Sequence, residues 1–388
     1  MSPASAVQAD ALPLRVSPRA LPAWVYNHPE MTRLEIERIL KPSWQIACHL
    51  NSLPKPGDFV TLAIGPESVV VLRNRQNEVV AFHNVCRHRG AQIFDGHGHC
   101  AGNIVCPYHG WTYRQDGSLV GVARADTFPD LDKSKLGLRP VRIATMGGFV
   151  FVCLAGDPPP PSEVFGPLLD ELAPYRTEEM VPLCPIYTEE WAADWKVVMD
   201  NYLESYHVPI GHPGLQRMFT PDYDDQKGHP GIARGTSWLR EQPSSRWRER
   251  TYQKLIGSVS GHLPEPNRRC WRFYSMLPNL GLDVYPDQMD FFQVLPRGAG
   301  RTIIRGAVFG LPDDRREMRI ARYLSDRINW QVNNEDRALC ERVQRGLASS
   351  SYEPGPLSTI ETWMLEFQNR LRQQIPESRL PKAPAVFA

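Results

Sequence analysis

Two short pairs of cysteine and histidine carry most of the chemistry that this sequence offers. The first pair is Cys86-Arg-His88, the second is Cys106-Pro-Tyr-His109, and residues 89–105 separate them. Each pair is compact enough to bind one metal ion from a single loop. Thiolates favour iron–sulfur chemistry, whereas imidazole nitrogens suit iron and zinc. These four ligands therefore predict either an iron–sulfur cluster or a zinc site.

The mixed composition of each pair favours the cluster over zinc. Structural zinc sites often use Cys-x-x-Cys pairs, whereas in a Rieske [2Fe–2S] cluster two histidines replace two cysteines on one iron. Gly110-Trp111 follows the last histidine, and an Asp116-Gly117 turn lies beyond it. This segment resembles the Rieske domains of ring-hydroxylating and related non-haem iron oxygenases. Imidazole ligands raise the reduction potential, so we expect the cluster to accept an electron from a ferredoxin or flavin donor.

A second group of ligand-type side chains lies further along the chain. Glu204 and His207 are three residues apart, which places them on one face of a helix. His212 follows, and Pro209 and Gly211 bend the chain so that both imidazoles can turn toward one ion. Two histidines and one carboxylate form the facial triad of non-haem Fe(II) oxygenases, which leaves coordination positions open for dioxygen. We therefore expect a mononuclear iron held by His207 and His212.

The third iron ligand must be a carboxylate from later in the chain, and spacing alone does not choose it. The acids that remain open are Asp283, Asp287, Asp290, Asp326, Glu335 and Asp336. Residues 332–347 resemble the oxygenase segment whose acidic residue completes the triad, and this resemblance favours Asp336, with Glu335 as the alternative. Neighbours on a helix point about a third of a turn apart, so we expect only one of them to reach the iron.

The resemblance also implies a role for Glu204. In this family the carboxylate three residues before the first iron histidine bridges that histidine to a Rieske histidine of the neighbouring subunit. Glu204 would then link His207 to His109 across a subunit contact, and a carboxylate that accepts an imidazole N–H fixes the orientation of the ring. Most members have Asp at this position. The glutamate of this chain resembles the branch that oxidises choline, glycine betaine, stachydrine and carnitine.

The resemblance implies a terminal oxygenase that hydroxylates or N-demethylates a small quaternary ammonium-like substrate. It would use O2 and electrons from a separate NAD(P)H-dependent reductase or a ferredoxin, since no Gly-x-Gly-x-x-Gly fingerprint is found. The alternative is an aromatic ring-hydroxylating or O-demethylating oxygenase, because the aromatic residues of the second half suit either a cation or a ring. A pure electron carrier would have no use for Glu204, His207 and His212. The family further implies a head-to-tail homotrimer.

The residue pattern of the first half of the chain predicts a small antiparallel β domain. Short runs of β-branched and aromatic residues at 58–64, 68–73, 79–85 and 148–153 are separated by Gly, Pro and Asn. Both Cys/His pairs fall on loops between such runs. The four prolines 158–161 cannot continue a strand or a helix, so we place a domain boundary there.

The second half predicts an α+β domain, an antiparallel sheet covered by helices. Expected strands lie at 271–276, 291–295 and 302–309, expected helices at 313–347 and 358–375, and expected loops over a pocket at 209–231 and 261–267. A further helix is expected over 30–43, with Thr32 as its N-cap. The predicted organisation is an N-terminal helical segment that packs on the catalytic domain (1–43), a Rieske domain (44–157) and a catalytic non-haem iron domain (162–388).

Composition excludes several other classes of protein. The 388 residues carry a net charge of +1, from 44 Lys and Arg against 43 Asp and Glu, so nothing points to nucleic acid or to an acidic membrane surface. We find neither a signal peptide nor an apolar run long enough to span a membrane. Eight scattered cysteines suit a reducing compartment, so a cytoplasmic enzyme is expected.

Overall fold

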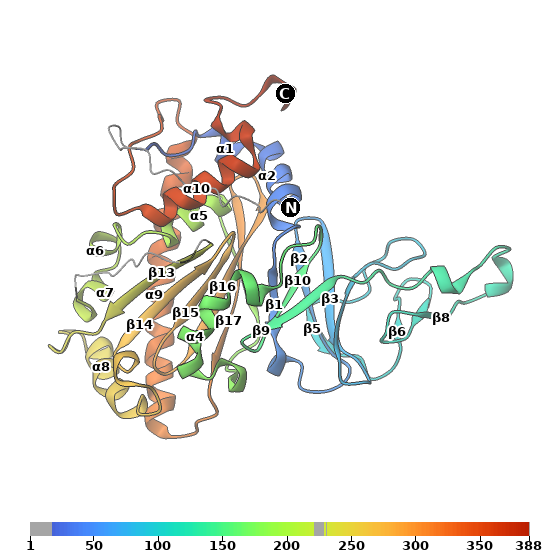
Figure 1. The fold of residues 1–388 in the computed structure, drawn as a ribbon, viewed down its shortest axis with the longest axis horizontal. Coiled ribbons are helices and arrows are strands. Elements are labelled where there is room, and N and C mark those ends of the chain that lie inside the picture. Colours follow the sequence, from blue (N-terminus) through green and yellow to red (C-terminus); the bar gives the residue numbers. More distant parts are fainter. Residues whose placement is uncertain (1–17, 221–228, 230, 388) are drawn as a thin grey trace, which may run out of the picture.

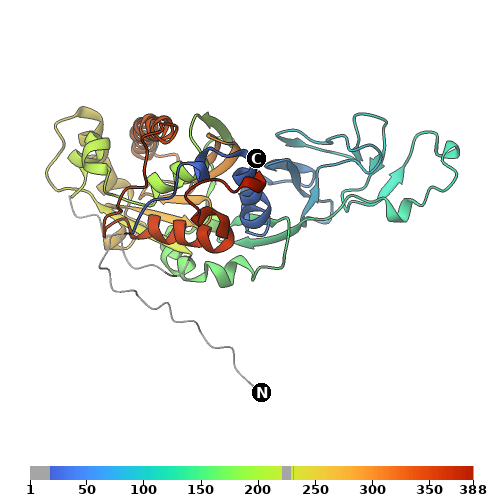
Figure 2. The same cartoon turned by 90° about the horizontal axis from the view of Figure 1, so that it is seen from above.

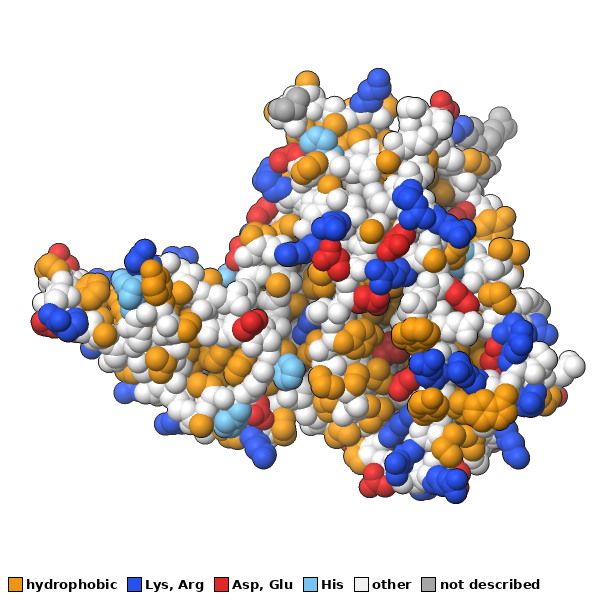
Figure 3. All heavy atoms as spheres, turned by 180° about the vertical axis from the view of Figure 1, so that it is seen from behind, with side chains coloured by type: hydrophobic (Ala, Val, Ile, Leu, Met, Phe, Trp, Pro, Cys, Tyr) orange, Lys and Arg blue, Asp and Glu red, His pale blue; other side chains and the backbone are white. Residues whose placement is uncertain are grey.

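The chain folds into a large body with a smaller lobe that projects from it. The computed structural model describes residues 18–220, 229 and 231–387. The other residues include parts of the predicted N-terminal segment 1–43 and of the predicted loop 209–231, which lie outside the described residues. Figure 1 shows the body built on one long sheet, and Figure 2 shows the lobe extending away from it in the perpendicular view. The space-filling view from behind shows the concave corner where lobe and body meet (Figure 3).

Two small antiparallel sheets form the lobe and carry both Cys/His pairs. One sheet has the strand order β4-β3-β2-β5, and the other has the order β6-β7-β8. The pair at 86–88 follows β4, and the pair at 106–109 connects β6 to β7. The strands are β2 (Asp58–Ile64), β3 (Glu67–Arg73), β4 (Val79–His83), β5 (His97–His99), β6 (Ile104–Val105), β7 (Thr112–Tyr113) and β8 (Leu119–Gly121).

The lobe has an apolar core of its own directly beneath the two loops. Val70 and Leu72 of β3 pack there with Phe82 of β4, and Trp111 and Tyr113 close the core from the second sheet. β-Branched and aromatic residues of this kind suit a pleated, half-buried surface, which is why the short runs seen in the sequence form strands. The core therefore gives the two loops a rigid platform.

A third sheet joins the lobe to the body. It has the order β1-β10-β9, with β1 spanning Gln45–His49, β10 spanning Phe149–Cys153 and β9 spanning Arg142–Met146. Every residue of β1 and β10 is buried. Alternate side chains of β10 pack on opposite sides, since Val150 belongs to the core shared with the lobe while Phe151 packs in the core beneath the large sheet. This sheet thus couples the two parts mechanically.

The body is built on a seven-stranded antiparallel sheet, which confirms the predicted α+β class. Its main path runs β11-β17-β16-β15-β14-β13, and β12 also pairs with β17. The three strands expected from the sequence lie inside β14, β16 and β17. The bounds are β11 (Val181–Pro182), β12 (Tyr187–Trp191), β13 (Ile232–Trp238), β14 (Cys270–Met276), β15 (Leu280–Val284), β16 (Met289–Gly298) and β17 (Arg301–Gly310).

Helices cover both faces of this sheet. On one face Leu324 of the long helix α9 packs with Tyr252 of α8 and with Trp271 of β14. On the other face Leu168 of α4 packs with Phe291 of β16. In Figure 2 the long helix α9 is seen end-on, next to the large sheet. The helices are α3 (Pro161–Val164), α4 (Gly166–Leu172), α5 (Trp195–Tyr202), α6 (Val208–Gly211), α7 (Pro213–Met218), α8 (Trp247–Val259), α9 (Arg316–Leu347) and α10 (Thr362–Gln374).

The N-terminal helix differs from its prediction at its start. After α1 (Trp24–Asn27), α2 spans Pro29–Glu35 and continues as a π-helical turn, η1 (Ile36–Leu40). The N-cap is His28, whose side chain accepts a hydrogen bond from the backbone N–H of Glu30, so the prediction of Thr32 was wrong. Pro29 explains the difference, because proline is favoured at the first helical position.

The predicted loops near the iron motif also contain short helices. α7 lies inside the expected loop 209–231, α6 begins one residue before it, and Pro209 and Pro213 each occupy an early helical position. No helix in the described part of the chain is long and apolar enough to cross a membrane.

Candidate metal centres and substrate cavity

The segment that carries the second group of ligands begins on helix α5. Asp194 caps this helix by accepting a hydrogen bond from the backbone N–H of Lys196. The helix ends at Tyr202, so Glu204 and His207 do not share a continuous helix as the spacing suggested. They meet because the chain turns after Tyr202, and Glu204 Oε2 accepts a hydrogen bond of 3.1 Å from the backbone N–H of His207.

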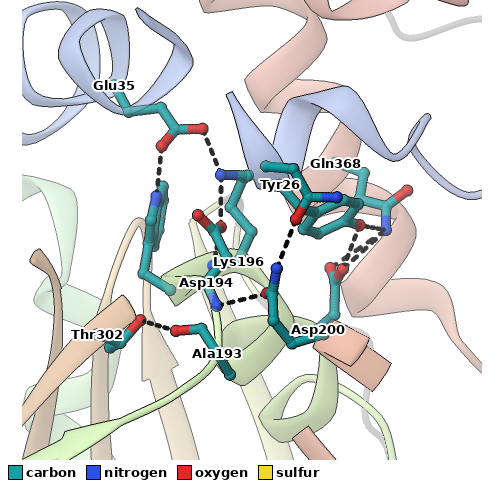
Figure 4. A network of polar contacts seen from close by, with 11 residues as sticks. Tyr26, Glu35, Ala193, Asp194, Lys196, Asp200, Thr302 and Gln368 are labelled. Carbon is teal, nitrogen blue, oxygen red and sulfur yellow. Dashed lines mark hydrogen bonds and ion pairs between the residues drawn. The ribbon is translucent and has the colours of Figure 1, made fainter. Parts of the chain in front are cut away.

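A buried polar network fixes α5 in the body (Figure 4). Lys196 Nζ lies 2.7 Å from Glu35 of α2 and 2.5 Å from Asp194, and none of the three side chains is exposed. Further along α5, Asp200 accepts hydrogen bonds from Tyr26 at 2.7 Å and from Gln368 of α10 at 3.2 Å. The two flanking carboxylates raise the pKa of Lys196 although burial opposes its charge, so it remains protonated. The N-terminal segment and α10 thus hold the helix that leads into the ligand segment.

Three ligand-type side chains converge at the end of this segment. His207 Nε2 and His212 Nε2 lie 3.2 Å apart, and Asp336 Oδ1 of α9 lies 3.5 Å from the first and 3.0 Å from the second. These atoms all lie within 4.8 Å of one another. Two ligands at right angles, each about 2.1 Å from one ion, are about 3 Å apart, so the arrangement fits a facial triad.

The proximity of the two histidines also governs the charge of Asp336. Burial favours its neutral form, but the neighbouring imidazoles of His207 and His212 hold the pKa of Asp336 below its usual value. The acid is therefore an anion, as a metal ligand must be. Of the acids left open by the sequence, the described structure brings Asp336 alone to both Nε2 atoms.

Each histidine has a second carboxylate on its other ring nitrogen. His207 Nδ1 donates to Glu204 Oε1 at 2.5 Å, and His212 Nδ1 donates to Glu335 Oε2 at 2.9 Å. Such contacts fix the tautomer, so that Nε2 is left free to bind a metal. Glu335, which the sequence offered as an alternative third ligand, lies behind His212. Its contact depends on the packing of α9 against the ligand segment and has no signal in the local sequence.

A cavity of about 530 Å³ opens beside the three converging side chains. The large sheet forms its floor, α9 and the ligand segment form its walls, and its size is within the usual range for small-molecule sites. Aromatic side chains contribute much of the lining, and these are Tyr187, Trp191, Tyr202, Trp271, Phe273, Tyr285, Phe292, Trp330 and Trp363. The geometry therefore provides a place for an organic molecule directly beside the triad.

The two Cys/His pairs meet in the lobe. His88 Nδ1 and His109 Nδ1 lie 3.1 Å apart, the separation expected for two ligands of one iron. Cys86 and Cys106 are buried, whereas both imidazoles are partly exposed. Burial raises the pKa of Cys106, and the neighbouring thiol of Cys86 adds to this effect. Two buried sulfurs and two outward-facing imidazoles suit a cluster with one sulfur-ligated and one imidazole-ligated iron.

The two loops have matching backbones. Gly90 and Gly110 each lie four residues after a cysteine, each has a positive φ (76° and 68°), and each N–H bonds to the carbonyl of that cysteine. Glycine adopts this conformation without the cost that other residues incur. Trp111 stacks on the ring of His88, with centroids 4.8 Å apart and 7° between the planes. Both loops are therefore shaped to present a cysteine inward and a histidine outward.

Comparison with known proteins agrees with both sites. A family model described as "Rieske [2Fe-2S] domain" matches residues 43–132, and one described as "Ring hydroxylating alpha subunit (catalytic domain)" matches residues 170–377, more than half of the chain. The chain belongs to the Rieske non-haem iron oxygenases. Membership of this family implies a Rieske [2Fe–2S] cluster and a mononuclear iron, which confirms both predicted cofactors, and it makes the protein an O2-dependent oxidoreductase.

Curated relatives cover nearly the whole length of this Rieske oxygenase. The glycine betaine monooxygenase oxygenase subunit of Chromohalobacter salexigens is 32% identical, over 92% of this chain and 86% of the relative. The chloroplastic choline monooxygenase of Arabidopsis thaliana is 30% identical, over 94% and 84%. The solved structure of a quaternary ammonium Rieske monooxygenase, described in relation to carnitine oxidation by gut microbiota and inter-subunit electron transfer, has a TM-score of 0.79 at 24% identity, over 92% and 96%. At that identity the likeness establishes the fold.

Proposed function

We propose that this Rieske oxygenase is the terminal oxygenase of a multicomponent system that hydroxylates or N-demethylates a small quaternary ammonium-like compound. The observation that carries the proposal is the position of an aromatic-lined cavity beside His207, His212 and Asp336 in a chain 30–32% identical to glycine betaine and choline monooxygenase subunits. Glu204 supports the same branch, because the glutamate at this position distinguishes it from most of the family.

In this proposal His207, His212 and Asp336 bind the mononuclear iron. Cys86, His88, Cys106 and His109 bind the cluster. Glu204 orients His207 and, through a contact with His109 of a neighbouring subunit, connects the two centres. The 2.5 Å contact between Glu204 Oε1 and His207 Nδ1 supports the first of these roles. The bound iron supplies the site at which dioxygen is reduced beside the substrate, and the cluster supplies an electron.

The side chains contribute position and proton control. Because Glu204 and Glu335 hold the Nδ1 protons, His207 and His212 present lone pairs from Nε2 to the ion. The cavity holds the substrate with an N-methyl group next to the triad. Insertion of one oxygen atom of O2 into a C–H bond gives a hemiaminal, while two electrons and two protons reduce the other atom to water. The hemiaminal then releases formaldehyde, the amine and a proton.

A homotrimer is part of the proposal. In both views the lobe, which carries the cluster loops next to β6, lies at one side of the molecule, and α6 and α7 lie toward the opposite side (Figures 1 and 2). Electron transfer within one chain would have to cross the molecule, whereas a head-to-tail neighbour brings the lobe of one subunit to the ligand segment of the next. The partly exposed imidazoles of His88 and His109 leave room for such a contact.

The remaining parts of the proposal concern organisation and partners. The division into an N-terminal helical segment (1–43), a Rieske domain (44–157) and a catalytic domain (162–388) is supported by the contact of Glu35 with Lys196 and by the separate cores of lobe and body. An NAD(P)H-dependent reductase or a ferredoxin would supply electrons to the cluster. A cytoplasmic location remains a prediction.

Single-turnover product analysis tests the proposed function. The iron-replete, chemically reduced enzyme is exposed to O2 with a panel of quaternary ammonium compounds and a panel of aromatic acids and ethers. We expect formaldehyde or a hydroxylated ammonium product from the first panel. Turnover of the aromatic panel alone would overturn the proposal and assign the cavity to an aromatic ring.

A further inference from the structure

Two carboxylates lie side by side in the floor of the substrate cavity. Asp283 of β15 and Asp290 of β16 are directly opposite each other in the antiparallel register, and both line the cavity. Like charges at such positions destabilise a sheet. Among the described residues neither carboxylate forms an ion pair with Lys, Arg or His. Two acids in this arrangement inside a cavity are stabilised either by a retained proton or by a positive charge from elsewhere.

The surrounding row of the sheet is otherwise neutral. Directly opposite residues point to the same face, so Gly235, Phe273, Asp283, Asp290 and Val308 form one row across five strands, and all of them line the cavity. The pair is therefore part of the floor of the substrate cavity rather than a separate surface site.

Aromatic rings surround the pair on the same face. Tyr202 donates a hydrogen bond of 2.6 Å to Asp283 Oδ1, and its ring packs edge-on against Phe292 with centroids 4.4 Å apart. The ring of Phe292 lies close over the sheet because its neighbour is Gly281, where a Cβ atom would come within 2.3 Å of the ring. Aromatic faces next to a carboxylate attract organic cations through the ring quadrupole as well as through charge.

The charged residues of the lining are almost all acidic. Glu189, Glu204, Asp283, Asp290, Asp326 and Asp336 are exposed to the cavity. Among the described residues of the lining, Arg234 is the single basic side chain other than histidine. In β13 Arg234 is the neighbour of Gly235, so its side chain points to the opposite face of the sheet, where it forms an ion pair of 2.6 Å with Glu171. The described lining thus offers counter-charges for a cation and no Lys or Arg that faces the cavity to pair with a carboxylate.

We propose that this cavity selects an organic cation that carries no carboxylate, with Asp283 and Asp290 as its counter-charge. The inference rests on the proposed function and narrows it, since glycine betaine and carnitine are zwitterions whereas choline carries a positive charge alone. A carboxylate in this cavity would lie among acids without a Lys or Arg to balance its charge, which costs more than the loss of one favourable contact. The trimethylammonium group would rest on Tyr202 and Phe292, above the pair.

The raised pKa values of Asp283 and Asp290 fit a pair that becomes fully charged only when a cation binds. Burial raises the pKa of Asp283 to about 7, and burial together with Asp283 raises the pKa of Asp290 well above its usual value. Without ligand the pair therefore retains a proton at neutral pH. A bound cation favours the ionised form, as any adjacent positive charge does.

A matched pair of ligands tests the inference on the complete, metal-loaded enzyme. Choline and glycine betaine share a trimethylammonium group and differ mainly in an alcohol against a carboxylate. Isothermal titration calorimetry under anaerobic conditions gives Kd for each, and formaldehyde release or oxidation of the alcohol carbon gives kcat/KM. We expect choline to bind roughly tenfold tighter or more, as the penalty of an unpaired buried charge requires.

Variants test whether Asp283 and Asp290 cause the preference for choline over glycine betaine. Asp290→Asn and the double variant Asp283→Asn/Asp290→Asn should each weaken choline binding, the double variant by about tenfold or more, with little effect on glycine betaine. Asp314→Asn, an equal charge change at an exposed residue, is the control. Thermal melts check that each variant is folded, and the comparison of the two ligands on the unmodified enzyme needs no variant.

The outcomes separate this inference from the proposed function. Equal binding and turnover of choline and glycine betaine, or tighter binding of glycine betaine, would overturn the selection against carboxylates while the proposed function stands. Binding of an uncharged aromatic ether, with no binding of either cation, would overturn both. Preference for choline that persists in the double variant would remove the role of Asp283 and Asp290.

Discussion

Lys196 Nζ lies 2.7 Å from Glu35 Oε1 at a point where neither side chain is exposed to solvent. This contact joins α2, near the start of the described chain, to α5, which leads into Glu204 and His207. A buried ion pair is weak evidence for net stability, but removal of one partner leaves an uncompensated charge in the interior. The contact therefore determines how firmly the ligand segment is held.

We predict that Lys196→Met destabilises the protein by about 3–5 kcal/mol, because Glu35 and Asp194 would remain buried without a counter-charge. Thermal and denaturant unfolding followed by circular dichroism measures the effect. Lys135→Met is the matched control, since Lys135 forms an ion pair with Asp132 that is largely exposed. Exposed pairs contribute about 0–1 kcal/mol. Equal losses in the two variants would contradict the role assigned to the buried network.

A second prediction concerns the independence of the two metal centres. His207→Ala should abolish turnover and remove the mononuclear iron while both cluster irons and the visible absorbance of the cluster are retained. The reason is structural, because His88 and His109 are held by the separate core of the lobe. Iron analysis and absorbance spectra of the purified variant make the measurement. A colourless His207→Ala protein would mean that the two centres do not fold independently.

The two neighbouring acids of α9 should behave differently. Asp336→Ala removes the carboxylate closest to both Nε2 atoms and should lose the mononuclear iron altogether. Glu335→Gln removes the negative partner of His212 Nδ1 but leaves the triad, so iron affinity should fall about 10–100-fold. Iron titration of the metal-free variants measures both. If Glu335→Gln lost the mononuclear iron while Asp336→Ala retained it, Glu335 would be the iron ligand and Asp336 the residue that supports it.

Local sequence predicts the ligand pairs well and the long-range contacts poorly. His88 lies two residues from Cys86, and one loop fixes their relation, so the spacing is visible in the chain. Asp336 is distant from His207 in sequence, and only a resemblance singled it out. The contact of Glu335 with His212 depends on how α9 packs, which no periodicity reveals.

The floor of the cavity is a second example of a long-range contact that the local sequence does not predict. The sequence offers Asp283 and Asp290 only as candidate iron ligands, and their meeting depends on the register between β15 and β16. A shift of one residue would send one of them to the opposite face of the sheet. The helix prediction failed for a different reason, because Glu204 and His207 meet through a turn after α5 and not on a helix face.

The last prediction concerns the pH dependence of stability at Asp287. This buried carboxylate accepts a hydrogen bond of 2.8 Å from Tyr252, and burial raises its pKa to about 7. The unfolded value is about 3.9, so between these values the folded protein holds one more proton than the unfolded chain, and stability falls as pH rises, by up to about 1.4 kcal/mol per pH unit. Asp287→Asn cannot titrate. Its melting temperature should therefore improve relative to the unmodified protein as pH rises from about 4 to about 7. Asp314→Asn should show no such change with pH. If the difference in melting temperature between Asp287→Asn and the unmodified protein were the same at every pH, Asp287 would not have the raised pKa assigned to it.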